Sequence, residues 1–251
     1  TMRQLHHGNI LHGSQDTHSV SRDRPIVYYH PFGPAGQVFE HFRSQRGLKV
    51  AIVGMGTGGM APYIQAWQSL TYFEIDPEVV KIARNKDLFT YLSEARGKVQ
   101  VITTDGRLGL QGLASTTYDI MVLDAYSSDS IPVHLMTREA VQLYFERLKP
   151  HGLLLFHISN RYLNLEAVLG NISADLHIPG LAQNFDSDSV MHRVRSYEKD
   201  LVGSSHWVLM ARREQDLKPW ISDSRWTRLC EEPGVGVWTD QYSNLFSVIR
   251  W

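Results

Sequence analysis

The chain has 251 residues, 43% of them hydrophobic, which is enough for one large domain or for one domain with a small appendage. Its formal net charge of −1, with charges of both signs spread along the chain, excludes the basic stripe typical of nucleic-acid binding. The single cysteine, Cys230, excludes an internal disulfide, and no apolar run approaches the roughly 18 residues of a membrane span. We therefore expect a cytoplasmic chain. Because it begins at Thr1 rather than at a methionine, we also expect it to be a piece of a longer protein.

Residues 1–45 differ in character from the rest of the chain. They are rich in His, Gly and Ser, and they contain short runs such as GNILHG and PIVYYH. Short β-prone runs separated by glycines are typical of a hairpin. We predict a small N-terminal β-hairpin region over 1–45 and a larger domain over 46–251.

The larger domain alternates between apolar runs and amphipathic stretches. This alternation predicts a mostly parallel sheet covered by helices on both faces, the α/β class. The segment 186–205 is polar and weakly periodic, which predicts a mobile loop. The predicted strands are 49–54, 70–76, 98–105, 118–124, 152–159 and 206–212, and the predicted helices are 59–67, 77–85, 137–149 and 163–176.

A glycine-rich turn follows the first of these strands. Gly54, Gly56 and Gly59 fit the pattern G-x-G-x-x-G, and Gly58 adds another glycine. Such a turn lets a ligand approach the backbone closely. Glu74 lies twenty residues after Gly54, at the end of the next strand, where a carboxylate can accept the hydroxyls of a ribose.

Acidic residues also end the next two strands. Asp105, followed by Gly106, ends the third strand, and Asp124 ends the fourth. Parallel sheets bind ligands at the carboxyl ends of their strands. A dinucleotide enzyme uses the same loop for a pyrophosphate, but carboxylates after the second and third strands favour an adenosyl-sulfonium cofactor over a nicotinamide.

Five motifs together resemble the spermidine/spermine synthase (polyamine aminopropyltransferase) family. The likeness runs from about residue 5 to about residue 175, with WTDQYSNLFSVIR at 238–250 similar to a bacterial branch in which this domain follows a membrane transporter-like region. The resemblance implies a class I methyltransferase-like Rossmann fold with a mostly parallel seven-stranded sheet, and thus a Rossmann-like catalytic domain over 46–251. The motifs are VGMGTGG, YFEIDPEVVKIAR, TTDGR, YDIMVLDAYSSDSIPVHLMT and LKPHGLLLFHISNRY.

The resemblance also implies a reaction: transfer of an aminopropyl group from decarboxylated S-adenosylmethionine to an amine, with release of methylthioadenosine. Asp124 matches the family's catalytic base, and Asp129, in the gate loop that follows, matches its amine-binding aspartate. A base is needed because an aliphatic amine, with a pKa of about 10, is protonated at neutral pH and cannot attack carbon. Tyr29 and His30 resemble a Tyr-His pair that lines the pocket, and Gln15 a glutamine that contacts the cofactor.

The expected site therefore has two sets of residues and no metal. The catalytic set is Asp124, Asp129 and Tyr29; the cofactor-binding set is Gln15, His30, Gly54, Gly56, Thr57, Gly58, Glu74, Asp105, Gly106 and Asp124. Expected partners are a small amine such as putrescine, the transporter-like region outside this chain and a second copy in a homodimer, with no nucleic acid. The fused branch gives an alternative localisation, as the soluble domain of an inner-membrane protein.

The chain departs from the family pattern at three places. Thr57 stands where the family has an aspartate that holds the cofactor's amine, Pro31 replaces a glutamate after His30, and the gate loop is two residues longer. These departures leave two alternatives open. One is an enzyme that uses intact S-adenosylmethionine, as a methyltransferase or by cleavage to methylthioadenosine. The other is a non-catalytic polyamine- or nucleoside-sensing domain of a transporter.

Two further pairs of residues have no assigned role in the sequence. His157 and Ser159 end the fifth strand at the edge expected to hold the site, but no G-x-S-x-G motif supports a hydrolase triad. Asp240 and Tyr242 either return acidity to the pocket or belong to a C-terminal edge strand.

Overall fold

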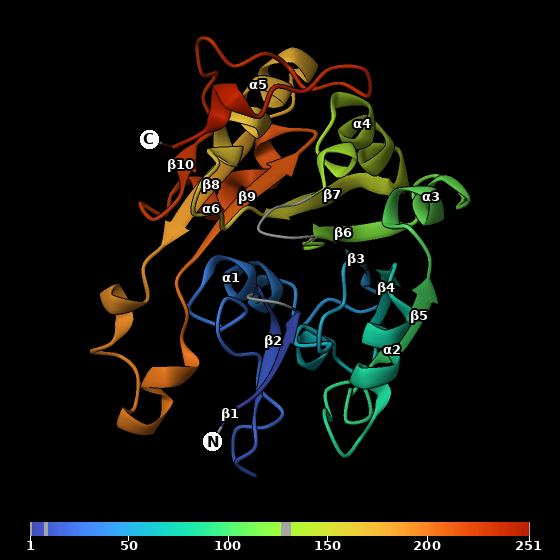
Figure 1. Ribbon diagram of the computed structural model, residues 1–251, viewed down its shortest axis with the longest axis vertical. Helices are drawn as coiled ribbons and strands as arrows, with labels where there is room; N and C mark the ends of the chain where they lie inside the picture. The colour runs from blue at the N-terminus through green and yellow to red at the C-terminus, as the bar shows by residue number, and fades with distance from the viewer. Residues whose placement is uncertain (1, 8–9, 127–131, 251) are drawn as a thin grey trace. The chain divides into compact units, whose positions relative to one another are not determined.

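The computed structural model describes residues 2–7, 10–126 and 132–250 (Figure 1). The chain divides into two compact units. Unit 1 comprises residues 1–106 and 185–205, and unit 2 comprises residues 107–184 and 206–251. The predicted boundary after residue 45 falls inside unit 1, and that division into domains stays a prediction.

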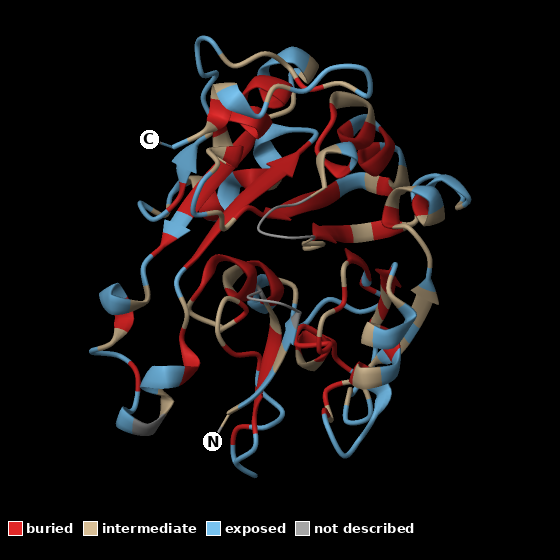
Figure 2. Cartoon of the chain, in the orientation of Figure 1, coloured by how far each residue is buried: buried red, intermediate tan, exposed pale blue. Residues whose placement is uncertain are grey.

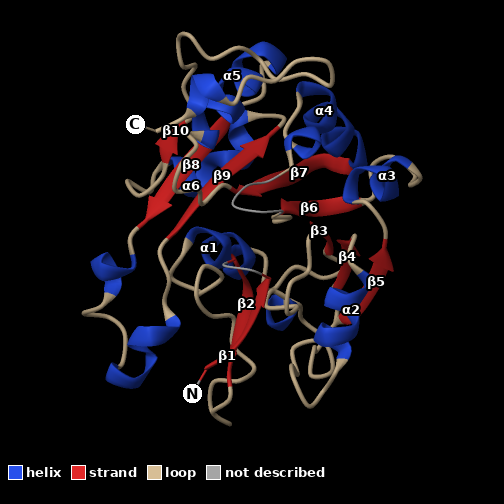
Figure 3. Cartoon of the chain, in the orientation of Figure 1, coloured by secondary structure: helices blue, strands red, loops and turns tan. Residues whose placement is uncertain are grey.

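Unit 1 contains the predicted hairpin and three parallel strands (Figure 3). In the hairpin, β1 (Met2–His7) pairs antiparallel with β2 (Ile10–Asp16). The parallel strands β3 (Lys49–Val53), β4 (Ser69–Glu74) and β5 (Lys98–Thr103) are paired in that order. The helices of this unit are α1 (Pro34–His41), η1 (Ala61–Tyr63), α2 (Pro77–Arg84), η3 (Ser187–Val190) and η4 (Ser196–Leu201).

Local chemistry explains where α2 begins. The side chain of Asp76 accepts a hydrogen bond from the N–H of Glu78, and Pro77 occupies the first turn, where its missing N–H costs nothing. The strand before it ends at Glu74, so the turn between β4 and α2 is short. This is the strand–turn–helix unit that the sequence predicts.

The predicted helix over 59–67 is wrong. Only the three-residue 3₁₀ helix η1 forms there, and the chain is already extended at Ile64, with φ −78° and ψ 119°. Glycine and proline are the two poorest helix formers; Gly59 and Pro62 fall within this stretch, and Gly58 directly precedes it. Three such residues outweigh the apolar periodicity on which the prediction depended.

The segment 186–205, predicted as a loop, contains η3 and η4. Val190, Val194 and Val202 of this segment are buried against Phe185 and Phe32. A parallel bridge also joins Val202 to Val27. Its apolar residues are too widely spaced to give a periodic signal, yet they form a small core.

Unit 2 contains five strands in the order β10-β8-β9-β7-β6. Parallel pairing joins β6 (Tyr118–Leu123) to β7 (Leu148–His157), whereas β9 (Ser205–Ala211) runs antiparallel to β7, and β10 (Thr227–Arg228) antiparallel to β8 (Gly180–Phe185). All seven residues of β9 are buried (Figure 2). The helices here are α3 (Gly106–Gln111), η2 (Val133–Leu135), α4 (Arg138–Arg147), α5 (Leu165–Leu176), η5 (Glu214–Leu217), α6 (Lys218–Ile221) and η6 (Phe246–Val248).

In the described residues, eight strands lie outside the hairpin, three in unit 1 and five in unit 2. The resemblance predicts seven. The additional strand is the two-residue β10, which is too short to leave a pattern in the sequence. Across residues 2–7, 10–126 and 132–250, no helix has both the length and the apolar character needed to cross a bilayer.

Candidate active site

The glycine loop of unit 1 packs directly against the N-terminal hairpin. Gly54, Gly56 and Gly58 have φ values of +89°, +51° and +82°, which L-residues with side chains adopt at a cost. A Cβ at Gly56 would lie 1.9 Å from the carbonyl oxygen of His12 in β2. Glycine is therefore required at Gly56 both by the turn and by the approach of β2.

Glu74 is tied to this loop. Its Oε2 accepts a hydrogen bond from the N–H of Met55 at 2.9 Å, and its Oε1 accepts one from the N–H of Asp76 at 3.0 Å. The residue is 8% exposed. The carboxylate is thus held beside the loop by two backbone donors, and each oxygen has a second lone pair with which to accept a hydroxyl proton.

Asp105 and Gly106 follow β5 in the same unit. The pairing of Val53 with Phe73, and of Glu74 with Thr103, brings the carboxyl ends of β3, β4 and β5 to one edge. A Cβ at Gly106 would lie 2.2 Å from Cγ1 of Val53, so the chain after β5 packs closely against β3. Asp105, which is partly buried, follows β5 at this edge.

Thr57 has a buried hydroxyl. The residue is 1% exposed, and its Oγ1 has no hydrogen-bond partner among the described residues. Leaving a buried hydroxyl unsatisfied costs about 1–3 kcal/mol. A polar ligand group that hydrogen-bonds to this hydroxyl would recover that free energy. The unsatisfied hydroxyl of Thr57 is therefore consistent with a polar ligand bound at the loop.

Tyr29 lies next to this loop, and His30 follows it in the same unit. A Cβ at Gly59 would lie 3.0 Å from Cδ2 of Tyr29, which places the tyrosine ring against the loop. Burial lowers the pKa of His30 to about 4, and its Nδ1 accepts a hydrogen bond from the N–H of Phe32 at 3.2 Å. His30 is therefore neutral at pH 7, with its proton on Nε2, and does not repel a nearby cation.

Gln15 has a different set of contacts from the one the resemblance implies. Its Nε2 donates to the carbonyl of Arg22 at 2.7 Å and to Oγ1 of Thr90 at 2.9 Å, and its Oε1 accepts from the N–H of Thr90 at 2.9 Å. These bonds fasten β2 to the segment around residue 90. The contact of Gln15 with a cofactor stays a prediction.

Asp124 belongs to unit 2, where it follows β6 directly. Its Oδ1 lies 2.6 Å from Nδ1 of His157, at the end of β7, and Nε2 of His157 lies 2.8 Å from Oγ of Ser159. The side chains of Asp124 and His157 are 7% and 5% exposed. The sequence places each of these residues at a strand end but gives no sign that they are connected.

The register of the parallel β6–β7 ladder explains why Asp124 and His157 lie next to each other. Leu123 pairs with Phe156 in the parallel β6–β7 ladder, so the next residues, Asp124 and His157, lie side by side. Asp129, the predicted amine-binding residue, lies outside the described residues. Within the described ranges no cluster of three or more His, Cys, Asp or Glu side chains is arranged to hold a metal ion.

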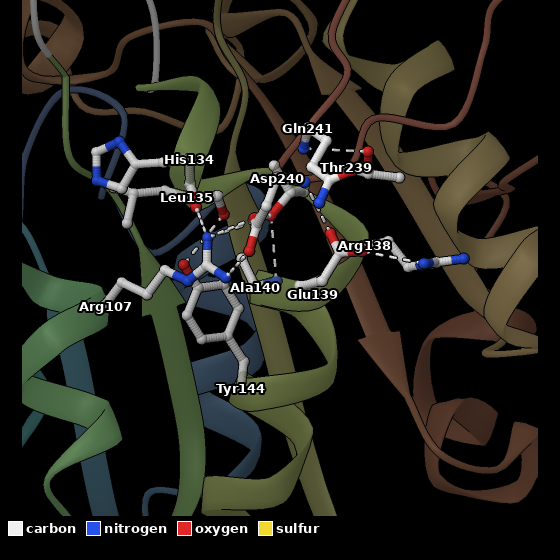
Figure 4. A network of polar contacts seen from close by, with 11 residues as sticks. Arg107, His134, Leu135, Arg138, Glu139, Ala140, Tyr144, Thr239, Asp240 and Gln241 are labelled. Carbon is white, nitrogen blue, oxygen red and sulfur yellow. Dashed lines mark hydrogen bonds and ion pairs between the residues drawn. The ribbon is translucent and has the colours of Figure 1, made fainter.

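Asp240 is held by an arginine that the sequence did not identify as its partner (Figure 4). Nη1 and Nη2 of Arg107 donate to its two carboxylate oxygens at 2.7 and 2.5 Å, and Oγ1 of Thr137 donates to Oδ1 at 2.7 Å. These contacts with Arg107 lower the pKa of Asp240. In place of an edge strand, only a single bridge joins Thr239 to Tyr242.

A cleft of about 690 Å³ lies beside this ion pair in unit 2. Because Arg107 neutralises Asp240, the carboxylate does not add a net negative charge to the cleft. The lining residues are Arg107, Val133, His134, Thr137, Thr239, Asp240, Gln241, Tyr242 and Ser243.

Two curated proteins are similar to this chain. A probable polyamine aminopropyl transferase of Bifidobacterium longum (strain NCC 2705) is 26% identical over 154 residues, which cover 60% of this chain and 32% of that protein. A polyamine aminopropyltransferase of Vibrio vulnificus (strain CMCP6) is 33% identical over 113 residues, which cover 43% of this chain and 36% of that protein. The chain spans about a third of the length of these curated relatives. No protein-family model matches it.

Solved structures show the fold. A probable spermidine synthase from Corynebacterium glutamicum superposes with a TM-score of 0.57 at 15% identity, covering 84% of this chain and 78% of that one. Human methyltransferase-like protein 13, in complex with SAH, superposes with a TM-score of 0.50 at 16% identity, covering 71% of this chain and 81% of that one. The predicted class I methyltransferase-like Rossmann fold with a small N-terminal hairpin is confirmed.

Proposed function

We propose that this chain is a spermidine synthase-like aminopropyltransferase, which transfers an aminopropyl group from decarboxylated S-adenosylmethionine to an amine. The observation that carries the proposal is the hydrogen bond from Met55 to Glu74, which holds a carboxylate against the glycine loop. A ribose presents two hydroxyl donors, and Glu74 offers acceptor oxygens beside a turn that admits a ligand close to the backbone. The likeness to two aminopropyltransferases adds the reaction class.

The residues of unit 1 fit an adenosyl-sulfonium compound in two further respects. His30 is neutral at pH 7 and so does not repel a sulfonium, and the hydroxyl of Thr57 needs a polar partner. We assign Glu74 to the ribose, Asp105 to the adenine, the glycine loop with Gly106 to close packing around the nucleoside, and Tyr29 to the cationic group by cation–π attraction. Gln15 is assigned to the cofactor on the basis of the family resemblance alone.

Asp124 is assigned the proton transfer. The nitrogen of the amine attacks the carbon beside the sulfonium, the C–S bond breaks with its electron pair left on sulfur, and methylthioadenosine is released. The nitrogen loses a proton, which the carboxylate of Asp124 accepts. Asp129 is assigned to hold the amine on the basis of the family resemblance alone.

Product analysis tests this proposal. The protein is incubated with S-adenosylmethionine or its decarboxylated form, with and without putrescine, and the products are identified by mass. We expect methylthioadenosine and spermidine only when the decarboxylated form and putrescine are both present. Asp124→Asn should keep adenosyl affinity but lose about 10²–10⁴-fold in turnover, which is the usual contribution of a general base. Unchanged turnover in that variant would remove Asp124 from the reaction.

Thr57 favours a second candidate, an enzyme that uses intact S-adenosylmethionine. The intact compound carries a carboxylate that an aspartate at position 57 would repel, and the neutral hydroxyl of Thr57 removes this repulsion. The same incubations separate the candidates. Adenosylhomocysteine indicates methyl transfer, and methylthioadenosine formed from the intact compound without a new polyamine indicates cleavage.

Three assignments about the wider protein complete the proposal. We propose putrescine or a similar small amine as the acceptor, a membrane transporter-like region as a covalent neighbour outside this chain, and a homodimer of the domain. Sedimentation measures the homodimer directly, and fractionation of cells that express the whole protein separates a cytoplasmic location from an inner-membrane one. Polyamine binding in calorimetry with no turnover on any sulfonium compound would instead support a sensing domain.

A further inference from the structure

A chain of three hydrogen bonds in unit 2 ends on Asp124. The N–H of His206 donates to Oγ of Ser159 at 2.8 Å, Oγ of Ser159 lies 2.8 Å from Nε2 of His157, and Nδ1 of His157 lies 2.6 Å from Oδ1 of Asp124. Three different segments supply these groups, namely the ends of β6 and β7 and the start of β9. No sequence motif assigns a role to His157 or Ser159, and the proposed reaction does not use them.

The chemistry of the partners assigns the protons. An ionised carboxylate only accepts hydrogen bonds, so the hydrogen between Asp124 and His157 lies on Nδ1. In a neutral imidazole the other nitrogen is then an acceptor, so the hydroxyl of Ser159 donates to Nε2. Ser159 in turn accepts from the backbone of His206 with a lone pair of Oγ. The partners therefore select the tautomer of His157 that carries its proton on Nδ1.

The imidazole ring is also held by packing. It stacks on Trp207, with ring centroids 4.5 Å apart and an angle of 13° between the planes. Trp207 is paired with His157 across the β7–β9 ladder. On another side the hydroxyl of Tyr126 donates to the carbonyl oxygens of His157 and Ser159 at 2.6 and 3.2 Å. Rotation of the ring would therefore break both its stacking and its two hydrogen bonds.

We propose that His157 is a positioning residue, which fixes the orientation of the Asp124 carboxylate by a hydrogen bond from Nδ1, and that Ser159 selects the tautomer that can donate this bond. The inference rests on the proposed role of Asp124 as the proton acceptor. A charge-assisted hydrogen bond between buried groups is about twice as strong as a neutral one, so its loss weakens the restraint that keeps the carboxylate turned toward the amine. His157 itself takes no proton from the substrate.

The order Asp-His-Ser also resembles a hydrolase triad, and the test includes that alternative. In a hydrolase the serine oxygen attacks a carbonyl carbon after giving its proton to the histidine. Here Ser159 lies two residues after His157 at the end of a strand, and its oxygen already accepts a backbone N–H. The geometry therefore points to support of Asp124 rather than to a nucleophilic serine.

Two variants of nearly equal polarity separate the two hydrogen bonds of His157. In His157→Asn the amide nitrogen takes the place of Nδ1 and keeps the bond to Asp124. In His157→Gln the longer side chain places its amide nitrogen near the position of Nε2, which keeps the contact with Ser159 and loses the one with Asp124. Both variants leave the glycine loop of unit 1 unchanged, so neither should alter adenosyl affinity directly.

The measurement is kcat and KM for aminopropyl transfer in both variants, with the dissociation constant of methylthioadenosine and a thermal unfolding curve for each. We expect His157→Gln to lose about 10–100-fold in kcat, as a lost hydrogen bond to a charged group predicts, with KM and adenosyl affinity within about twofold. His157→Asn should stay within about fivefold of the wild type, because it keeps that bond. Equal kcat values in the two variants would overturn the inference.

NMR spectroscopy of the wild-type protein tests the hydrogen bond between His157 and Asp124 directly, even if a His157 variant fails to fold. In the wild-type protein labelled with ¹⁵N at histidine, we expect a slowly exchanging, far-downfield Nδ1 proton, which Asp124→Asn removes or shifts strongly. A proton found on Nε2 instead, or labelling of Ser159 by a fluorophosphonate, would overturn it. A wild-type protein that transfers nothing from any sulfonium compound refutes the proposed function first, whereas wild-type transfer with an unaffected His157→Gln refutes this inference alone.

Discussion

Replacing Gly56 by alanine tests the contact between the glycine loop and the hairpin. Gly56 has φ +51°, and a Cβ there would lie 1.9 Å from the carbonyl oxygen and 3.1 Å from the carbonyl carbon of His12. Both are backbone atoms of β2, so no side-chain rotation relieves the clash. Gly47→Ala is the matched control, because Gly47 also has a positive φ, +70°, but has nothing within 4 Å of a new Cβ.

The two variants share one cost and differ in another. An L-residue in the left-handed region costs about 1–2 kcal/mol, and the reduced freedom of the unfolded chain offsets about 0.4–1 kcal/mol of that. Gly47→Ala should therefore lower the free energy of unfolding by about 1 kcal/mol. Gly56→Ala must also separate the loop from β2, and overpacking of this kind costs about 1–3 kcal/mol more. The difference between the two variants measures the backbone contact itself.

Urea unfolding followed by tryptophan fluorescence gives both free energies, and calorimetry with methylthioadenosine gives the affinities. We expect Gly56→Ala to weaken adenosyl binding at least about tenfold. A tenfold loss corresponds to about 1.4 kcal/mol, which lies within the cost of displacing the loop. Gly47→Ala should change affinity by less than about twofold. If the two variants lose the same stability and the same affinity, the hairpin does not pack on the loop as described, and the reasoning about Gly56 is wrong.

Three other predictions concern charged and titratable groups. Glu74→Gln replaces one of the two acceptor oxygens with an NH2 group, which only donates, so either the N–H of Met55 or the N–H of Asp76 loses its acceptor. The variant should cost about 1–3 kcal/mol in urea unfolding and weaken adenosyl binding in calorimetry. The pKa of His30 falls from 6.5 to about 4 on folding, so the unfolded chain binds the extra proton between these values. Stability should then fall by at most about 3 kcal/mol, reduced by solvent screening, as pH drops from 6.5 to 4, with no such slope in unfolding curves of His30→Phe. Arg107 lowers the pKa of Asp240, so the ion pair stabilises the fold above the ordinary carboxyl pKa, and this stabilisation is lost as pH falls below it. Asp240→Asn should therefore speed hydrogen exchange in residues 238–243 at pH 7 and remove the acid dependence of their protection against exchange.

Periodicity and turn chemistry predicted most of the elements near the residues proposed to bind the nucleoside. The strands ending near Gly54, Glu74 and Asp105 are where the sequence places them, because short apolar runs bounded by Gly, Asp and Pro have few other solutions. No helix spans 59–67, because Gly58, Gly59 and Pro62 disfavour the helix that the apolar spacing predicts. Propensity decides in so short a stretch, where one extra turn of helix gains few hydrogen bonds.

The contacts within the site were harder to predict, because they depend on register and on partners distant in sequence. Asp124 was identified by its position after a strand, whereas its hydrogen bond to His157 follows from the alignment of β6 with β7. The ion pair of Asp240 with Arg107 spans 133 positions and leaves no local pattern. Gln15 shows the converse: its position matched a family residue, but its amide bonds to Thr90 become visible only in three dimensions.

The charge near the glycine loop bears on which sulfonium compound the proposed site would prefer. Decarboxylated S-adenosylmethionine carries two positive groups, the sulfonium and the amine, whereas the intact compound adds a carboxylate to the same tail. Thr57 supplies no charge to either tail, and His30 is neutral at pH 7. Glu74 already accepts two backbone N–H groups, so it is committed to the loop rather than to the tail. The loop residues of unit 1 therefore lack the charge that would favour the decarboxylated compound, and any such preference has to come from acidic residues elsewhere, with Asp129 the first to be replaced in a test of selectivity.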